Sequence, residues 1–334
     1  MKTKFATLLI GLLFASGANA QDIHWSQFND NPIFQNPGHA GHFKGDYRFV
    51  GNFRDQWRSV TVPFSTLSFS ADSRLYSNPN LGYGLLFFHD VAGDGKFRTI
   101  EVQGNVSWLM KLTSDSTHTL RAGMNFGMNH RQVNWNNFYF DNQFNGIQFD
   151  PTLPTGELYQ ADRKTNLSVG TGFLYEYLIN ERKKVTAGIG VYNLNRPNHG
   201  FYNEKISRDI RMNVFAKAIY KLDVDWDLIP SFQFNVQGKY REMLIGSSAK
   251  YTLVNRLNDY KALYGGVWYR NRDAAYLSLG MDYNNWFVGL SYDMNFSKLV
   301  PASNFRGGFE IAARYILNHF RPKKTLHRVC PDYI

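Results

Sequence analysis

One stretch near the C-terminus decides the fold class: Asn285-Asn-Trp-Phe-Val-Gly-Leu-Ser-Tyr-Asp-Met-Asn-Phe296. A β-strand points successive side chains to opposite faces. One alternate set of these residues is wholly apolar, and the other is mostly polar or small. The apolar set is Trp286, Val288, Leu290, Tyr292, Met294 and Phe296. The segment 306–317 repeats the pattern, with Phe309 and Ile311 on one face and Glu310 and Arg314 on the other.

The same alternation recurs along the chain and predicts fourteen strands. About 10 residues at ~3.3 Å rise, tilted by ~40°, span roughly 25 Å, the height of an outer-membrane apolar band. A soluble sandwich accounts for the alternation but not for this strand length. We therefore expect an all-β protein, an antiparallel transmembrane β-barrel of about 14 strands in the outer membrane. The predicted strands are 46–58, 64–75, 81–90, 98–112, 117–131, 164–179, 183–194, 208–222, 226–237, 240–253, 261–271, 274–284, 285–296 and 306–317.

Charged strand faces indicate the lumen side. Arg211, Asn213 and Lys217 alternate with apolar residues, and an Arg or Lys facing lipid at mid-membrane costs ~2–4 kcal/mol. We expect these faces to point inward. A mean hydropathy of −0.39 is compatible with such a barrel, because alternation hides its apolar residues. Aromatic residues near strand ends are typical of interfacial girdles, and the candidates are Tyr47, Trp57, Trp135, Trp226, Trp268 and Trp286.

Connection lengths predict the orientation of the barrel. If residue 46 starts in the periplasm, most connections on that side are short turns, although the tenth, near 255–260, is longer. The long loops, 89–97, 132–163, 195–207 and 297–305, then lie outside the cell. With fourteen strands, both termini lie in the periplasm.

The N-terminus predicts export. Lys2 and Lys4 precede a short apolar run and the small residues Ala18-Asn-Ala20, which together form a secretory signal peptide cleaved after Ala20. The run is too short for a membrane anchor. The predicted parts are therefore a signal peptide at 1–20, an irregular periplasmic or plug segment at 21–45, the barrel at 46–317, and a basic periplasmic tail at 318–334. We expect the segment 21–45, with its two Asn-Pro steps, to be extended and anchored.

Composition and motifs exclude several function classes. The formal net charge is +10, or +8 without Lys2 and Lys4, but the basic residues are dispersed and predict no nucleic-acid partner. The chain has a single cysteine, Cys330, and therefore no internal disulfide framework. No catalytic signature, cofactor motif or metal site is predicted. His39 and His42 have metal-ligand spacing, but polar surface is the simpler interpretation of this irregular segment.

Two groups of residues are candidates for interactions. Asp293, Asn295, Glu310 and Arg314 share one face of neighbouring strands; they form either a lumenal salt-bridge network or a contact with a ligand or plug. The loop 132–163 is long and too aromatic for a disordered segment, so we expect a folded cap or a protein-docking surface. Its docking candidates are Trp135, Phe138, Tyr139, Phe140, Phe144, Phe149 and Tyr159.

Both ends of the mature chain carry a set of recognisable motif residues. They are Ser26, Gln27, Asn31, Pro32, Asn36, Pro37, Ala40, Gly41, Arg54, Trp57, Asp72, Tyr292, Asp293, Asn295, Gly307, Gly308, Phe309 and Glu310. Together they resemble the PorP/SprF family of type IX secretion membrane proteins. The family usually has Ala after the second Asn-Pro, where this chain has Gly38.

The resemblance implies an outer-membrane barrel that works with the type IX secretion and gliding machinery. Its implied partners are outer-membrane lipid, a secreted surface protein with a C-terminal sorting domain, and periplasmic peptidoglycan-linked lipoproteins. A general porin or a hydrophobic-substrate transporter would use the same barrel. An outer-membrane enzyme would need a convergent polar constellation, and the sequence predicts none.

Overall fold

The computed structural model describes residues 23–56, 58, 62–93, 95–156, 161–201, 205–256, 259–297 and 300–319. The expected signal peptide, Trp57, Tyr159, Cys330 and nearly all of the basic tail lie outside these residues.

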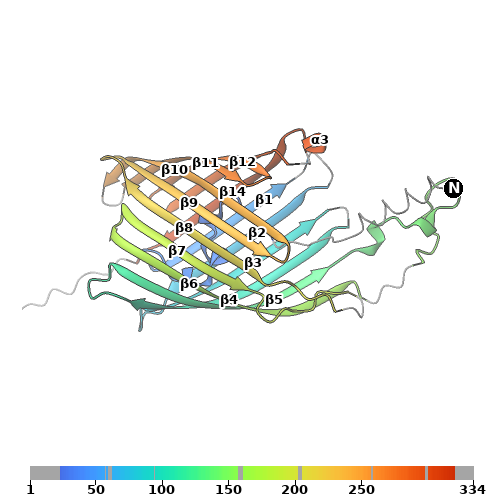
Figure 1. The fold of residues 1–334 in the computed structure, drawn as a ribbon, viewed down its shortest axis with the longest axis horizontal. Helices are drawn as coiled ribbons and strands as arrows, with labels where there is room; N and C mark the ends of the chain where they lie inside the picture. Colours follow the sequence, from blue (N-terminus) through green and yellow to red (C-terminus); the bar gives the residue numbers. More distant parts are fainter. Residues whose placement is uncertain are drawn as a thin grey trace, which may run out of the picture.

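Fourteen antiparallel strands form one closed barrel in which each strand pairs with its sequence neighbours and β1 pairs with β14. Figure 1 shows the tilted strands of this barrel. The strands are β1 (Tyr47–Gln56), β2 (Phe64–Arg74), β3 (Leu81–Ala92), β4 (Phe97–Lys111), β5 (His118–Gln132), β6 (Arg163–Asn180), β7 (Lys183–Tyr192), β8 (Arg211–Lys221), β9 (Trp226–Gln237), β10 (Tyr240–Arg256), β11 (Asp259–Arg270), β12 (Ala274–Tyr283), β13 (Trp286–Asn295) and β14 (Arg306–Leu317).

The predicted fold class is confirmed, and the strand boundaries agree within a few residues. The expected long tenth connection is wrong, because β10 runs to Arg256 and β11 begins at Asp259. A register shift between Thr252 and Val254 marks a β-bulge. A bulge adds one residue to one strand and therefore interrupts the alternation of faces, which hid the end of β10 in the sequence.

Long and short connections separate the two ends of the barrel. The connections 75–80, 112–117, 181–182, 222–225, 257–258 and 284–285 define what we call the short-turn end. The loops 133–162 and 193–210 lie at the opposite end, the loop end. In Figure 1 the green part of the chain that contains loop 133–162 projects beyond the strands.

The two faces of the strands differ as the alternation predicts. In β13, Asp293 is 3% exposed and its outward neighbour Tyr292 is 49% exposed. Trp226 and Trp286 are exposed at the short-turn end, where Trp286 packs on Tyr315 with ring centroids 4.6 Å apart. These two positions suit an interfacial girdle.

Trp268 is not a girdle residue, contrary to expectation. Its side chain is buried in the lumen, donates a hydrogen bond from Nε1 to Ser278 Oγ over 2.9 Å, and stacks on Tyr276. Trp268 was predicted as a girdle residue only because it lies near the end of a strand. Its parity in β11 matches that of inward-facing Arg270, and a side chain two residues away shares the same face.

Residues 23–42, here called the lumen segment, lie inside the barrel and are mostly buried. The segment is not extended, contrary to expectation. It folds into three short helices, η1 (Phe28–Asp30), α2 (Pro32–Gln35) and η2 (Pro37–His39). Each Asn-Pro step starts a helix, because proline fixes φ and needs no backbone partner at the first helical position.

Among the described residues, no helix has both the length and the apolar character that crossing a membrane requires.

The outward face generates a depth-dependent prediction. Leu279 lies in the middle of β12, whereas Leu253 lies near the short-turn end of β10; both are exposed. Leu279→Arg should lower the free energy of unfolding in lipid by ~2–4 kcal/mol, and Leu253→Arg by about 0–1 kcal/mol. Equilibrium unfolding of both variants in lipid vesicles measures the difference. Equal losses at both depths would contradict a lipid-facing outer surface.

Candidate functional site

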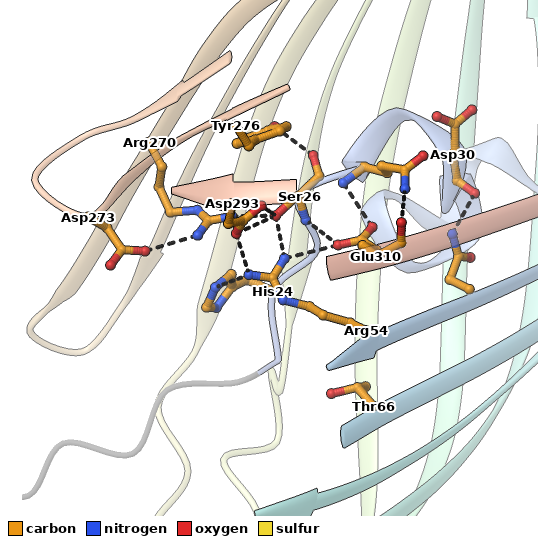
Figure 2. A network of polar contacts seen from close by, with 12 residues as sticks. His24, Ser26, Asp30, Arg54, Thr66, Arg270, Asp273, Tyr276, Asp293 and Glu310 are labelled. Carbon is orange, nitrogen blue, oxygen red and sulfur yellow. Dashed lines mark hydrogen bonds and ion pairs between the residues drawn. The ribbon is translucent and has the colours of Figure 1, made fainter. Parts of the chain in front are cut away.

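Ser26 of the lumen segment is the centre of a buried polar network near the loop end (Figure 2). Its Oγ donates to Asp293 over 2.9 Å and accepts from Arg54 and Arg270. Its backbone N–H donates to Glu310 Oε2 over 2.8 Å. One hydroxyl offers one donor and two acceptor lone pairs, so these contacts use its full capacity.

The charges around Ser26 are paired with one another. Arg54 forms ion pairs with Asp293 at 3.1 Å and Glu310 at 3.0 Å, and Arg270 pairs with Asp293 at 3.1 Å. Arg270 also pairs with Glu242 at 3.3 Å. All five side chains are almost fully buried. Removing one partner from such a group leaves a buried charge uncompensated, at a typical cost of about 3–5 kcal/mol.

Gln27 and Tyr276 complete the contacts of this part of the lumen segment. The Gln27 backbone N–H donates to Glu310 Oε1 over 2.9 Å, and its Nε2 donates to the Glu310 carbonyl oxygen over 3.0 Å. The Tyr276 hydroxyl donates to the Ser26 carbonyl oxygen over 2.6 Å. Both carboxylate oxygens of Glu310 thus receive a backbone N–H of the lumen segment.

The sequence left two interpretations of the inward polar group, a salt-bridge network and a contact with a ligand or plug, and both hold for part of the group. Asp293 and Glu310 are members of a salt-bridge network that is also a contact with the lumen segment. Arg314 lies apart and pairs with Asp30 at 3.7 Å and with Asp282 at 3.5 Å. Asn295 also lies apart and donates to Ser303 Oγ over 3.3 Å.

Asp72 holds the opposite end of the lumen segment. Its carboxylate accepts two hydrogen bonds from Arg48, at 2.9 and 2.8 Å, and one from the Gly41 backbone N–H at 2.7 Å. Arg48 also donates to the His39 carbonyl oxygen over 2.9 Å. Gly41 has φ +68°, a conformation that glycine adopts without steric cost.

The Asn-Pro steps are fixed to the strands between these two anchors. Asn31 donates to Ser68 Oγ over 3.0 Å, and Asn36 donates to the Phe173 carbonyl oxygen over 3.2 Å. Asn36 Oδ1 also accepts the Gly38 N–H over 2.7 Å, which caps η2. Pro32 and Pro37 start the helices described above.

Glycines on the inner wall give the lumen segment room. A Cβ on Gly82 would lie 2.1 Å from the carbonyl oxygen of Ala40, which is itself fully buried. A Cβ on Gly123 would lie 2.3 Å from the backbone nitrogen of Gly38, and one on Gly172 would lie 2.4 Å from Asn36 Oδ1. The barrel wall and the lumen segment therefore approach at backbone distance.

The remaining motif residues do not contact the lumen segment through their side chains. Tyr292 and Phe309 point outward and are exposed. Gly307 and Gly308 lie at the start of β14, where a Cβ would clash with backbone atoms of Asp293 and Asp55, respectively. They allow close strand pairing. Trp57 lies outside the described residues.

His39 and His42 are not surface residues, contrary to expectation. His39 is 8% exposed and packs on Phe215 with ring centroids 5.3 Å apart. His42 Nε2 lies 3.0 Å from Glu176 Oε2. Within the described part of the chain, no group of three or more His, Cys, Asp or Glu side chains is placed to hold a metal ion.

Loop 133–162 is folded over its described part, residues 133–156 and 161–162. It contains η3 (Trp135–Asn137), η4 (Asp141–Gln143) and a bridge between Phe144 and Phe149. Gln143 is buried and donates to the Leu153 carbonyl oxygen over 3.2 Å. Hydrogen bonds from the Thr152 hydroxyl and backbone N–H hold the pKa of Asp150 below its ordinary value and stabilise the turn that follows.

Most of the aromatic docking candidates are brought together by this loop. Tyr139 packs edge-on against Phe149 at 4.6 Å, and Phe138 packs between Trp135 and Phe140 at 5.9 and 6.4 Å. Tyr139 is 80% exposed, and the exposed group also includes Phe138, Phe144 and Phe149. Tyr159 lies outside the described residues.

Two cavities remain on either side of the lumen segment. The loop-end cavity has a volume of about 510 Å³; charged residues such as Glu101 and Arg208 and aromatic residues such as Phe88 both line it. The second cavity has a volume of about 350 Å³ and reaches Lys44 and Glu181 at the short-turn end. Neither was predicted, because a cavity depends on how the lumen segment fills the barrel.

Sequence reasoning also missed Arg270, Tyr276 and Glu242 as members of the network. Arg270 shares the parity of the other inward residues of β11, and this signal was available. Its pairing with Ser26, 244 positions away in the sequence, has no local signature.

Comparisons with known proteins agree with this architecture. The family model described as type IX secretion system membrane protein PorP/SprF matches residues 17–315. Among proteins with curated functions, none matches the sequence. The solved toluene transporter TbuX of Ralstonia pickettii is similar in fold, with 11% identity, a TM-score of 0.51, and coverage of 86% of this chain and 94% of that one.

Two further solved structures are similar at the same level. The Pseudomonas putida toluene transporter TodX has 9% identity and a TM-score of 0.52, and it covers 89% of this chain and 94% of its own. The monoaromatic hydrocarbon channel CymD has 10% identity and a TM-score of 0.52, with coverage of 87% and 94%. At these identities the likeness concerns the fold alone.

The network around Ser26 predicts that Arg54 retains the lumen segment. Arg54→Gln leaves Asp293 and Glu310 short of positive charge and should destabilise the docked segment by about 3–5 kcal/mol. Hydrogen exchange of residues 24–42 measures the loss of protection. Arg163→Gln is the matched control, because Arg163 pairs with Asp162 and both side chains are exposed, at 67% and 49%; its loss should matter by less than about 1 kcal/mol. Unchanged protection in Arg54→Gln would contradict the role given to the network.

The inner-wall glycines yield a steric prediction. Gly82→Ala should displace Ala40 and reduce stability by about 1–3 kcal/mol, because overpacking forces backbone shifts. Gly51→Ala is the control, since a Cβ there meets nothing within 4 Å. Thermal unfolding of both variants in detergent compares them. Equal midpoints would show that the lumen segment does not press against β3.

Proposed function

Because the chain belongs to the PorP/SprF family of type IX secretion system membrane proteins, we propose a docking function for this outer-membrane barrel. Its loop end holds a secreted surface protein that carries a C-terminal sorting domain. Its short-turn end faces the periplasm and contacts peptidoglycan-linked lipoproteins and other components of the secretion machinery. The predicted signal peptide, cleaved after Ala20, delivers the chain to the outer membrane. No catalytic reaction is part of this proposal.

The observation that carries the proposal is the folded aromatic loop 133–162. Exposed aromatic side chains on an ordered backbone provide large contact areas at a low entropic cost, and interfaces are enriched in them. Tyr139 and Phe149 hold each other in position, while the buried side chain of Gln143 ties the loop together from within. A pre-organised surface of this kind favours the interpretation that the loop binds a protein partner. A loop that only covered the pore would not need an ordered aromatic surface.

The lumen segment favours docking over conduction. Residues 23–42 pass between the Ser26 network and the Asp72 anchor and fill the middle of the barrel. A general porin needs a wide aqueous path, and this segment occupies the lumen where that path would run.

A hydrophobic-substrate transporter is supported only by likeness of fold. The loop-end cavity does not suit a hydrocarbon, because charged side chains form part of its wall. Arg208 pairs with Glu101 at 3.5 Å, and Arg131 lies over the Phe97 ring at 4.5 Å. Desolvating these groups against an apolar ligand would be costly.

The loop surface generates the functional prediction. The double change Tyr139→Ala and Phe149→Ala should reduce retention of the surface partner on intact cells by at least tenfold, because buried aromatic anchors typically contribute more than about 2 kcal/mol each. Deleting 136–157 should abolish retention while the barrel still folds. Tyr76→Ala is the matched control, since Tyr76 is 82% exposed at the short-turn end. Surface labelling of the partner, with total barrel measured in parallel, provides the readout.

Gentle purification of the tagged barrel distinguishes the remaining functions. Recovery of a large surface protein with a C-terminal sorting domain, or of a peptidoglycan-binding lipoprotein, supports docking. A barrel that purifies alone and carries steady ion currents in a planar bilayer would instead establish a porin.

A further inference from the structure

The second cavity, here called the short-turn-end cavity, has a basic and partly aromatic wall that docking at the loop end does not explain. It has a volume of about 350 Å³, within the range of small-molecule sites. Its wall joins the lumen segment to the inner faces of β7 to β14. Lys44 and Glu181 line its outer part, and their side chains are 85% and 63% exposed, so the cavity is open to solvent at this end.

Positive charge dominates the cavity wall. Six Lys or Arg side chains line it, against Asp30 and Glu181 as the acidic residues. Four of the six form ion pairs with acidic side chains. Arg48 pairs with Asp72 at 2.8 Å, Arg314 with Asp30 at 3.7 Å, Lys44 with Glu181 at 3.6 Å, and Lys250 with Asp227 at 3.9 Å.

Lys184 and Lys217 are the exceptions. Among the described residues, neither ammonium group has a carboxylate at ion-pair distance. Asp30 and Asp282 act on Lys217, and Glu176 acts on Lys184, only from further away. Lys217 pairs with Thr186 across the β7–β8 ladder, and Lys184 pairs with Ile219. The two lysines are therefore diagonal neighbours on the inner face, roughly 7–8 Å apart at their Cα atoms. Both side chains line the cavity, so an anion bound between them would gain contacts with two positive charges.

Part of the wall is aromatic. Trp268 stacks on Tyr276 with ring centroids 5.8 Å apart and meets Phe28 at 5.5 Å. Tyr264 meets Phe287 edge-on at 5.6 Å, and Phe215 lies beside Lys217 on the wall. Such a surface suits an apolar or aromatic body, while the lysines suit its charged end.

We propose that this cavity binds an organic anion with an apolar or aromatic body, whose carboxylate, sulfonate or phosphate group is held by Lys184 and Lys217. The site lies at the opposite end of the barrel from loop 133–162 and is independent of partner docking there. It places a small-molecule ligand against η1, and therefore next to Ser26 and Gln27 on the cavity wall.

Two sources could supply this chemistry. A soluble anion enters through the opening at Lys44 and Glu181. A membrane lipid is the second candidate, because the β8–β9 ladder lacks the pairs between Lys217↔Ser231 and Tyr220↔Leu228 and is therefore weakest beside the cavity. Pro230 lies in this interval and has no backbone N–H to donate. Ile219 and Ile229 line the cavity at the same place.

The test uses the full chain in nanodiscs of phosphatidylcholine and the probe 1-anilinonaphthalene-8-sulfonate. Its neutral analogue, N-phenyl-1-naphthylamine, has the same rings without the sulfonate. Wild-type protein should bind the anionic probe saturably and quench tryptophan emission. K184Q/K217Q should weaken its affinity about tenfold or more, because two charge-assisted contacts are lost. K184R/K217R should retain binding.

Lys221→Gln is the matched control, since Lys221 is exposed on the same strand and outside the cavity wall. Heat-modifiable gel mobility confirms that each variant is folded. Equal affinity of wild type and K184Q/K217Q would overturn the proposal, as would equally tight saturable binding of the neutral analogue.

Native mass spectrometry of protein extracted from its own membrane identifies the source of the ligand. A phospholipid or fatty-acid adduct that is lost in K184Q/K217Q supports the site and assigns a lipid. A non-lipid anion adduct that is lost in the same variant supports the site and assigns a soluble ligand. An adduct retained in the variant would show that binding occurs elsewhere.

Discussion

The structure depends on the neutralisation of buried charge around a single serine. Arg54, Arg270, Asp293 and Glu310 come from four strands and are all buried at one level of the lumen. The ion pairs alone leave some N–H donors of the arginines and some oxygen acceptors of the carboxylates without hydrogen bonds. Ser26 and Gln27 supply the missing donors and acceptors, including both backbone N–H groups that meet Glu310. Because a partly satisfied buried network is less stable than an apolar core, the barrel and the lumen segment stabilise each other.

This dependence explains why the family motif lies at the two ends of the chain. Residues 26–41 and 289–310 are far apart in sequence, but β14 closes the barrel against β1. Closure aligns Arg54 with Glu310 and brings both beside Ser26. Five motif residues that are scattered in the sequence, Ser26, Gln27, Arg54, Asp293 and Glu310, therefore form one spatial unit. The second anchor follows the same logic, since Asp72 and Arg48 from adjacent strands fix Gly41 just before the chain enters β1.

The sequence predicted the barrel well because its main signal is local. Alternation along each strand depends only on a residue and its next neighbours, and connection lengths separated the loop end from the short-turn end. It failed where the information is not local. The bulge at Thr252 interrupts the alternation, Trp268 turns inward to pack on Phe28, and His39 is covered by a barrel wall that no nearby residue predicts. The charged face was predicted, but its pairing with Ser26 requires the closed fold. The motif positions came from the family resemblance; the reason for them came from the structure.

The lumen segment also determines what the two ends of the barrel can do independently. It separates the loop-end cavity from the short-turn-end cavity and is fixed to the wall at both of its ends. A ligand on either side meets residues of the same segment: Phe34 and His24 line the first cavity, and Phe28 and His39 line the second. Any coupling between the two ends must therefore move η1 or α2 and disturb the charge network that holds Ser26. The stability of that network sets the free energy that a partner or ligand has to provide, because an equilibrium shifts only by the difference in binding to its two states.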